Sequence, residues 1–169
     1  MRGCVYLSTL KGALSGVVGP IIDKRLEGKL FLLTTVPIEE NVRNLLTMGF
    51  WGVAEQLEED GLLADLVRIN CFVTQYGDVS IKLDDNQEGC HMALAIYPVQ
   101  KWRNLQRTEL QMLTCIVEEL CHHYWNIEDE VRVNYKVLDI IKRILPNSNI
   151  QMSDLYNLQW MQEQNNSSQ

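Results

Sequence analysis

The residues best suited to chemistry lie around position 120, where the chain reads Glu118, Glu119, Leu120, Cys121, His122 and His123. If this segment is helical, each residue advances by about 100°, so Glu118 and His122 lie one turn apart on the same side. Glu130 follows soon after and can approach His122 if the next helix folds back across the first. Carboxylates and imidazoles that meet in this way can transfer protons or bind a divalent cation.

The helix that carries these residues is the clearest element in the chain. Thr108 and Gln111 have the spacing of a capping box, and the helical period continues from Glu109 to Trp125. The apolar residues fall on one stripe, opposite to the side that carries Glu118, so we expect the stripe to be buried. Its members are Leu110, Leu113, Val117, Leu120 and Tyr124.

A second helix is expected from about Ile127 to Leu145, with Asn126 as its cap and Pro146 behind it. Upstream, the turn residues Tyr76-Gly77-Asp78 lie between two alternating runs and predict a β-hairpin. The expected strands are Lys29–Val36, Leu66–Gln75, Val79–Leu83 and His91–Tyr97, and a helix is expected from about Ile38 to Asp60.

These elements predict a single α+β domain over residues 1–160, followed by a flexible tail over 161–169. In this arrangement a helix precedes a three-stranded antiparallel or mixed sheet, and two helices end the domain. The strands Leu66–Gln75, Val79–Leu83 and His91–Tyr97 are expected to form that sheet under the helix Glu109–Trp125.

Composition excludes several classes of protein. The chain has 169 residues, 22 acidic and 15 basic side chains and a net charge of -7, so binding nucleic acid through clustered Lys and Arg is not expected. Five cysteines without a CxxC pair suit free thiols in the cytoplasm. No segment approaches the ~20 apolar residues of a membrane span. We therefore expect a cytoplasmic protein, and Trp102 could anchor a protein partner if it is exposed.

The order of these elements and the residues near position 120 resemble the small zincin-type metallopeptidases of phages and mobile elements. Those proteins carry His-Glu-Leu-x-His on the helix after the third strand, followed by Glu-x-x-x-Asn. Here Glu118 to His122 and then Glu130 to Asn134 stand in the same order. The resemblance covers about residues 38–145, and its motif residues all fall in the last part of that range.

The resemblance implies a role for each matching residue. Glu119 would be the general base, and His122 and Glu130 would be metal ligands. Glu118 stands where the family has its first histidine ligand, so Glu118, His122 and Glu130 would form a set of two carboxylates and one imidazole. Such a set moves the metal preference from zinc toward Mn²⁺ or Fe²⁺. If it forms a site, the ligand atoms should lie within roughly 5 Å of one another.

Two functions of different classes follow from this sequence. Because the first histidine is missing, the sequence favours a non-catalytic, zincin-like interaction protein without a bound cofactor, encoded by a phage or mobile element and inhibiting or regulating a host or defence enzyme. The alternative is an intracellular metal-dependent peptidase with Zn, Mn or Fe at Glu118, His122 and Glu130. A simpler interpretation of the same residues is a solvated helix face with weak carboxylate–imidazole contacts.

Overall fold

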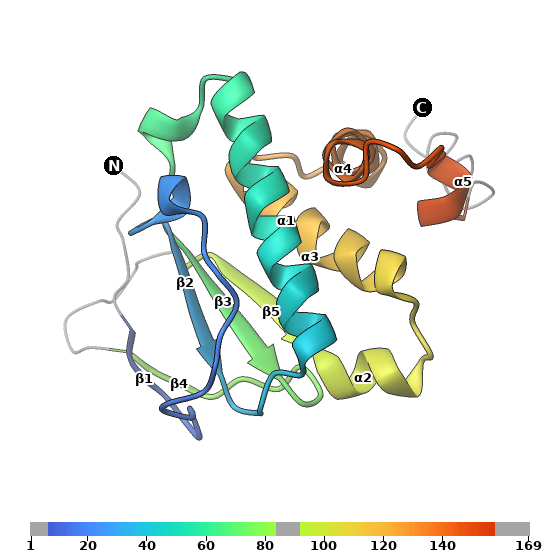
Figure 1. The fold of residues 1–169 in the computed structure, drawn as a ribbon. Coiled ribbons are helices and arrows are strands. Elements are labelled where there is room, and N and C mark those ends of the chain that lie inside the picture. Colours follow the sequence, from blue (N-terminus) through green and yellow to red (C-terminus); the bar gives the residue numbers. More distant parts are fainter. Residues whose placement is uncertain (1–6, 84–91, 158–169) are drawn as a thin grey trace.

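A parallel sheet of three strands forms the centre of the protein (Figure 1). The computed structural model describes residues 7–83 and 92–157. The strands are β2 (Leu30–Thr34), β3 (Ile69–Thr74) and β5 (Leu94–Pro98), in that order across the sheet. The middle strand β3 is buried along its whole length, as expected for the central strand of a parallel sheet, although Asn70 and Thr74 are polar. The predicted α+β class is confirmed.

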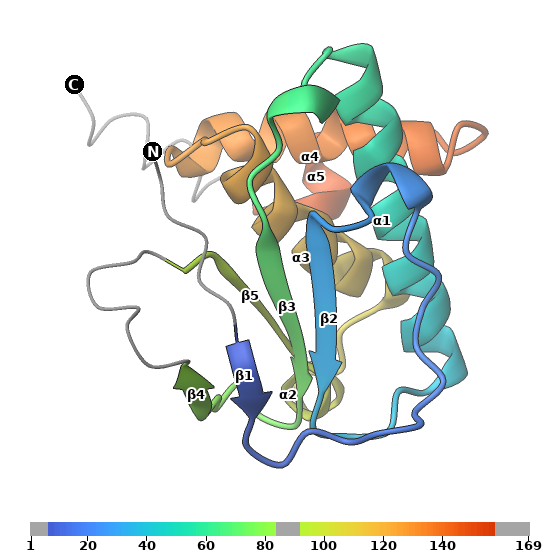
Figure 2. The same ribbon diagram turned by 90° about the vertical axis from the view of Figure 1, so that its left-hand side faces the viewer.

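A second, smaller sheet lies on the other side of the parallel sheet from the helices (Figure 2). It consists of β1 (Leu7–Leu10) and β4 (Ile81–Leu83), which pair antiparallel. Leu10 at the end of β1 is only 2% exposed, so this small sheet adds to the buried interior.

The predicted hairpin is wrong, and with it the antiparallel or mixed arrangement of the main sheet. Both edges of β3 are occupied, because β2 and β5 each pair with it in parallel. Residues 76–78 do bend, and the Gly77 N–H donates to the Thr74 hydroxyl at 3.0 Å with a φ of +98° at Gly77. The bend carries the chain away from β3 and toward β1, with which the three-residue β4 pairs.

Two long helices cover one face of the parallel sheet, and a third packs outside them (Figures 1 and 2). The first two, α1 and α3, agree with the predicted helices. The helices are α1 (Glu40–Glu59), α2 (Val99–Asn104), α3 (Glu109–Tyr124), α4 (Glu130–Ile144) and α5 (Met152–Leu155), with short 3₁₀ helices at Lys24–Leu26 and Leu63–Asp65.

The predicted apolar stripe of α3 faces the core. Leu113, Val117 and Leu120 are at most 1% exposed. The capping box is also present, because the Gln111 N–H donates to the Thr108 hydroxyl and the Thr108 N–H donates to the Gln111 side chain. This cap fixes the first turn of α3, and the connection to α4 fixes its last turn.

The connection between α3 and α4 differs from the expectation. Asn126 adopts a left-handed conformation with a φ of +50° and ends α3, so it cannot cap the next helix. Asp129 caps α4 instead, and its carboxylate accepts from the Arg132 N–H at 2.7 Å. The helix therefore begins at Glu130, which places that residue on the first turn beside the end of α3.

The segment between β5 and α3 contains the short helix α2. Trp102 on this helix is only 4% exposed, and its ring lies 6.2 Å from that of Tyr97 in β5. The suggestion that Trp102 anchors a partner from an exposed position is wrong, because its apolar ring completes the core instead.

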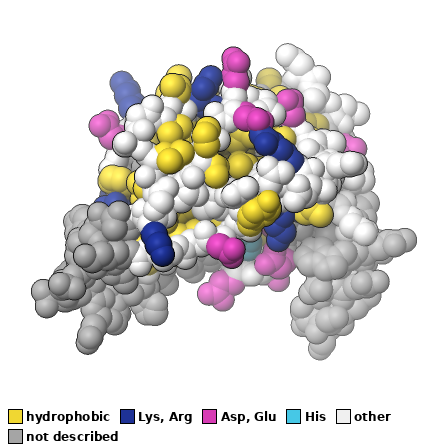
Figure 3. Space-filling model, turned by 90° about the horizontal axis from the view of Figure 1, so that it is seen from below, with side chains coloured by type: hydrophobic (Ala, Val, Ile, Leu, Met, Phe, Trp, Pro, Cys, Tyr) yellow, Lys and Arg dark blue, Asp and Glu magenta, His cyan; other side chains and the backbone are white. Residues whose placement is uncertain are grey.

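Some expectations concern residues outside those described. His91, at the start of the expected third strand, and the tail at 161–169 both belong to this group. Within the described residues, no helix has the length and apolarity needed to cross a membrane. The face seen in Figure 3 shows hydrophobic side chains in small groups, with Lys and Arg dispersed among acidic residues.

Gly49 lets α1 approach α3 closely. A Cβ atom at this position would lie 2.8 Å from the Cγ2 atom of Ile116, whose side chain is fully buried. An exposed Gly→Ala change in a helix usually stabilises by about 0.5–1 kcal/mol, whereas overpacking a core costs about 1–3 kcal/mol. At Gly49 the cost of overpacking should exceed the stabilisation that alanine gives to a helix.

We therefore predict that Gly49→Ala lowers the free energy of unfolding by about 1 kcal/mol. Chemical denaturation of the parent and variant proteins would measure the change. In an Ile116→Ala background the contacting methyl group is absent, so Gly49→Ala should be neutral or stabilising there. A stabilising effect in the parent background would contradict the close packing of α1 on α3.

Candidate metal centre

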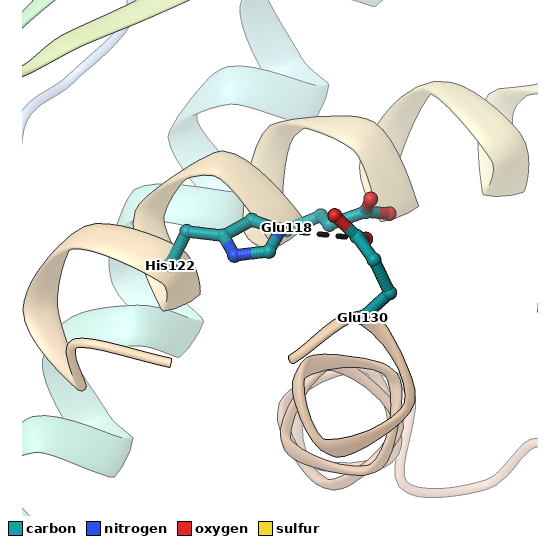
Figure 4. Close-up of side chains that lie close together, drawn as sticks. All are labelled: Glu118, His122 and Glu130. Carbon is teal, nitrogen blue, oxygen red and sulfur yellow. Dashed lines mark ion pairs between the residues drawn. The ribbon is translucent and has the colours of Figure 1, made fainter. Parts of the chain in front are cut away.

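Glu118, His122 and Glu130 converge at the junction of α3 and α4 (Figure 4). Each offers one ligand atom, and the three atoms lie within 4.8 Å of one another. His122 Nε2 lies 3.7 Å from Glu130 Oε2. The expectation that the three groups meet within about 5 Å is thus confirmed.

The orientation of His122 is fixed by the backbone of the α3–α4 connection. Its Nδ1 lies 2.6 Å from the carbonyl oxygen of Ile127, which can only accept a hydrogen bond. Nδ1 therefore carries the proton, and in the neutral imidazole the lone pair of Nε2 points toward Glu130. Histidines that ligate metals are commonly held in this way, with the other ring nitrogen donating to a carbonyl or carboxylate.

Tyr156 supports Glu118 from the far side of the cluster. Its hydroxyl donates to Glu118 Oε2 at 3.2 Å. Partial burial is the main reason that the pKa of Tyr156 is raised well above its usual range, and the neighbouring carboxylate adds to the shift. Tyr156 therefore stays protonated and remains a donor at neutral pH. No sequence pattern indicated this contact, because Tyr156 lies 38 residues from Glu118.

The surroundings of Glu118 disfavour its charge. Partial burial is the largest effect and raises its pKa above 4.5, the hydrogen bond from Tyr156 opposes this, and the nearby carboxylate of Glu130 raises it further. A bound cation would relieve both the desolvation and the repulsion between the two carboxylates.

Glu119 lies beside this cluster but does not belong to it. Its surroundings raise its pKa above 4.5 through desolvation, with His122 lowering the pKa and Glu130 raising it. The residue nevertheless remains exposed to solvent. A carboxylate that is close to the cluster, accessible to water and shifted toward neutral pH has the properties of a general base.

A cavity of about 270 Å³ opens beside Glu118 and Glu130. Its walls come from α3, α4 and the end of α5, together with Arg107 from the segment before α3. Apart from the two glutamates, it is lined by Arg107, Gln111, Thr114, Cys115, Asn134, Leu155 and Tyr156.

The helices that bear the ligands are joined at Asp60, just after α1. One oxygen of Asp60 accepts from Trp125 Nε1 at 2.6 Å and from Lys136 Nζ at 3.0 Å, and the other accepts from Gln56 at 3.0 Å. Burial raises the pKa of Asp60, but the hydrogen bonds from Lys136, Trp125 and Gln56 outweigh it and leave the pKa below 3.8. Asp60 thereby ties the end of α3 and the second turn of α4 to α1.

Other polar residues near the site have structural roles. His123 Nε2 lies 2.8 Å from the carbonyl oxygen of Val67, which joins α3 to the segment before β3. Burial raises the pKa of Cys115, so its thiol is mostly uncharged at neutral pH and is not an activated nucleophile. Cys71 and Cys121 are free, buried thiols.

Comparisons with models of protein families, with curated proteins and with solved structures gave no match. Two carboxylates and one imidazole make a suitable set for a divalent transition metal ion, and three protein ligands leave a position for water or substrate.

We predict that Glu118→Gln stabilises the protein without metal at pH 7, raising its Tm by about 1–3 °C. The substitution removes a charge that the fold disfavours. Because the pKa of Glu118 is raised in the folded state, the parent should gain stability as pH falls from neutral toward about 4.5, and the variant should gain less. Thermal melts between pH 7 and 4.5 would measure both effects, and a variant less stable than the parent at pH 7 would contradict the prediction.

Asp60 should show the opposite pH dependence. Because its pKa is lowered in the folded state, its contribution is present above about pH 3.8 and is lost as the pH falls further. We expect Asp60→Asn to lower the free energy of unfolding by about 1 kcal/mol at pH 7, with the difference from the parent shrinking below pH 4. Asp139→Asn on the exposed side of α4 is the matched control and should change stability by only tenths of a kcal/mol.

Proposed function

We propose that this protein binds one divalent metal ion through Glu118, His122 and Glu130 and hydrolyses a peptide bond. The convergence of three ligand atoms within 4.8 Å, with His122 Nε2 3.7 Å from Glu130 Oε2, is the observation that carries the proposal. Solvated acidic residues on a helix face need not present their atoms to a common point. Zinc, manganese and iron all suit this ligand set, and the second carboxylate favours manganese or iron.

The proposed zincin-like scaffold is supported only by the order of some of its parts. As the resemblance implies, α1 precedes β3 and β5, and the helix with Glu118 and His122 and the helix with Glu130 follow them, but β2 comes before α1 and the sheet is parallel. The role proposed for Glu119 comes from the same comparison of residues and is supported by its position next to Glu118 and its raised pKa.

In this proposal each side chain has a distinct task. The bound ion supplies a Lewis acid that polarises the substrate carbonyl and makes water more acidic. Glu119 accepts the proton of the attacking water and passes it to the leaving amine. Tyr156 holds Glu118 in place through the hydrogen bond that its hydroxyl donates to the carboxylate.

The second candidate is a non-catalytic protein that uses the same scaffold to bind another protein. One observation favours it: Glu118 occupies the position of a histidine ligand in the family that the chain resembles. In this case the protein would inhibit or regulate a host or defence enzyme on behalf of a phage or mobile element.

Metal analysis together with three substitutions distinguishes the two candidates. We expect protein purified without chelator to take up one equivalent of Zn²⁺, Mn²⁺ or Fe²⁺, and Glu118→Gln and Glu130→Gln each to abolish stoichiometric uptake. Glu119→Gln should retain the metal and the fold but lose peptide hydrolysis by at least ~100-fold, the usual contribution of a general base.

Absence of metal uptake by the parent would contradict the proposed function. Retention of the protein's biological effect in Glu119→Gln would instead support the non-catalytic candidate. Glu109→Gln, at the exposed start of α3 and outside the cluster, is the matched control and should alter neither metal content nor hydrolysis.

A further inference from the structure

Arg107 supplies the only positive side chain among the residues that line the cavity beside the cluster. One of its nitrogens donates to Cys115 Sγ at 3.4 Å. Because the pKa of Cys115 is raised by burial, this partner is an uncharged thiol, which is a weak acceptor. Within the described residues Arg107 has no carboxylate partner, so its guanidinium can still bind an anion.

Asn134 contributes a second donor to the same cavity. Its side chain is only 1% exposed, and its Nδ2 atom has no hydrogen-bond partner among the described residues. A buried amide donor without a partner is unfavourable, and such groups are rare unless they serve a purpose. An acceptor atom of a ligand in the cavity would satisfy it.

The net charge around the cavity depends on whether a metal ion is bound. Glu118 and Glu130 face it with two negative charges, which a divalent cation would offset. The positive charge of Arg107 would then be left without compensation. With metal bound, the cavity therefore attracts an anionic group, and without metal it repels one.

The size of the cavity limits the size of the molecule that can carry the anionic group. Its volume of about 270 Å³ lies just below the ~300–1,000 Å³ typical of small-molecule sites. This space suits one residue or the end of a peptide. A planar carboxylate matches both the forked donors of an arginine and a neighbouring amide N–H.

We propose that the cavity binds a carboxylate of the substrate through Arg107 and Asn134, so that cleavage occurs next to a C-terminal or acidic residue. This inference rests on the proposed function, because the ion both neutralises the cavity and polarises the bond to be cleaved. The carboxylate can come from the chain terminus or from a side chain, and the two sources share the same chemistry.

Calorimetry with small probes tests the proposal in the metal-loaded full-length protein carrying Glu119→Gln, in which the probes are not consumed. The probes are acetyl-Ala-Ala with a free carboxylate, its C-terminal amide, and acetyl-Ala-Glu-amide, which carries the carboxylate on a side chain. We expect at least one of the two acids to bind ~10-fold or more tightly than the amide, as is typical of a hydrogen bond to a charged group. The tighter acid identifies the source of the carboxylate.

Substitution then assigns the preference to residues. Arg107→Gln should lower the affinity for the acid probe to that for the amide. Arg103→Gln is the control and should leave the preference for the acid unchanged, because Arg103 lies outside the cavity and pairs with Glu39. Asn134→Leu should weaken acid binding and yet raise the Tm of the protein without ligand, because it removes an unsatisfied buried donor. A purely structural role for Asn134 would lower the Tm instead.

The outcomes separate this inference from the proposed function. Equal binding of both acids and the amide, or a preference that survives Arg107→Gln, would overturn the carboxylate site even if metal uptake and hydrolysis are found. An acid preference lost in Arg107→Gln would support the site even if no peptide is hydrolysed. Removing the metal should weaken acid binding, and tighter binding without metal would also overturn the proposal.

Discussion

The position of α4 relative to α3 is the constraint on which the candidate site depends, and Asp60 is the residue that fixes it. Its carboxylate accepts hydrogen bonds from Trp125 at the end of α3 and Lys136 on α4, while Gln56 holds it on α1. Lys136 also lies 5.2 Å from the centre of the Trp125 ring. Because three helices share one anion, a shift of α4 would break several charge-assisted contacts at once.

The short α3–α4 connection sets the finer geometry. The left-handed conformation of Asn126 ends α3, and Asp129 starts α4 only three residues later. Between them, the carbonyl of Ile127 turns back toward α3 and accepts from His122. The same short segment therefore brings Glu130 toward the cluster and orients the imidazole that faces it. The hydrogen bond to Ile127 holds the imidazole in one orientation, which is one condition for a preorganised ligand set.

The sequence predicted the parts of the fold that depend on neighbouring residues. The α3 cap, its buried stripe and the approach of Glu118, His122 and Glu130 all follow from helical spacing and a short connection. Strand pairing could not be predicted in this way, because alternation and a turn signal say nothing about whether β2 and β5 already occupy both edges of β3. The contact of Tyr156 with Glu118 was missed for a similar reason, since only tertiary packing of α5 brings the two together.

The electrostatics of the cluster connect stability to function. The fold places Glu118 and Glu130 together and partly removes Glu118 from water, which raises the pKa of Glu118 and disfavours its charged form. When its imidazole is protonated, His122 can form an ion pair with Glu130, because its Nε2 lies 3.7 Å from Glu130 Oε2. In the proposed function a divalent ion would complete the cluster and offset both carboxylates, and the same ion would make the neighbouring Arg107 cavity favourable for an anion. Metal binding should then precede substrate binding, because the second ligand is attracted only once the first has offset the two negative charges.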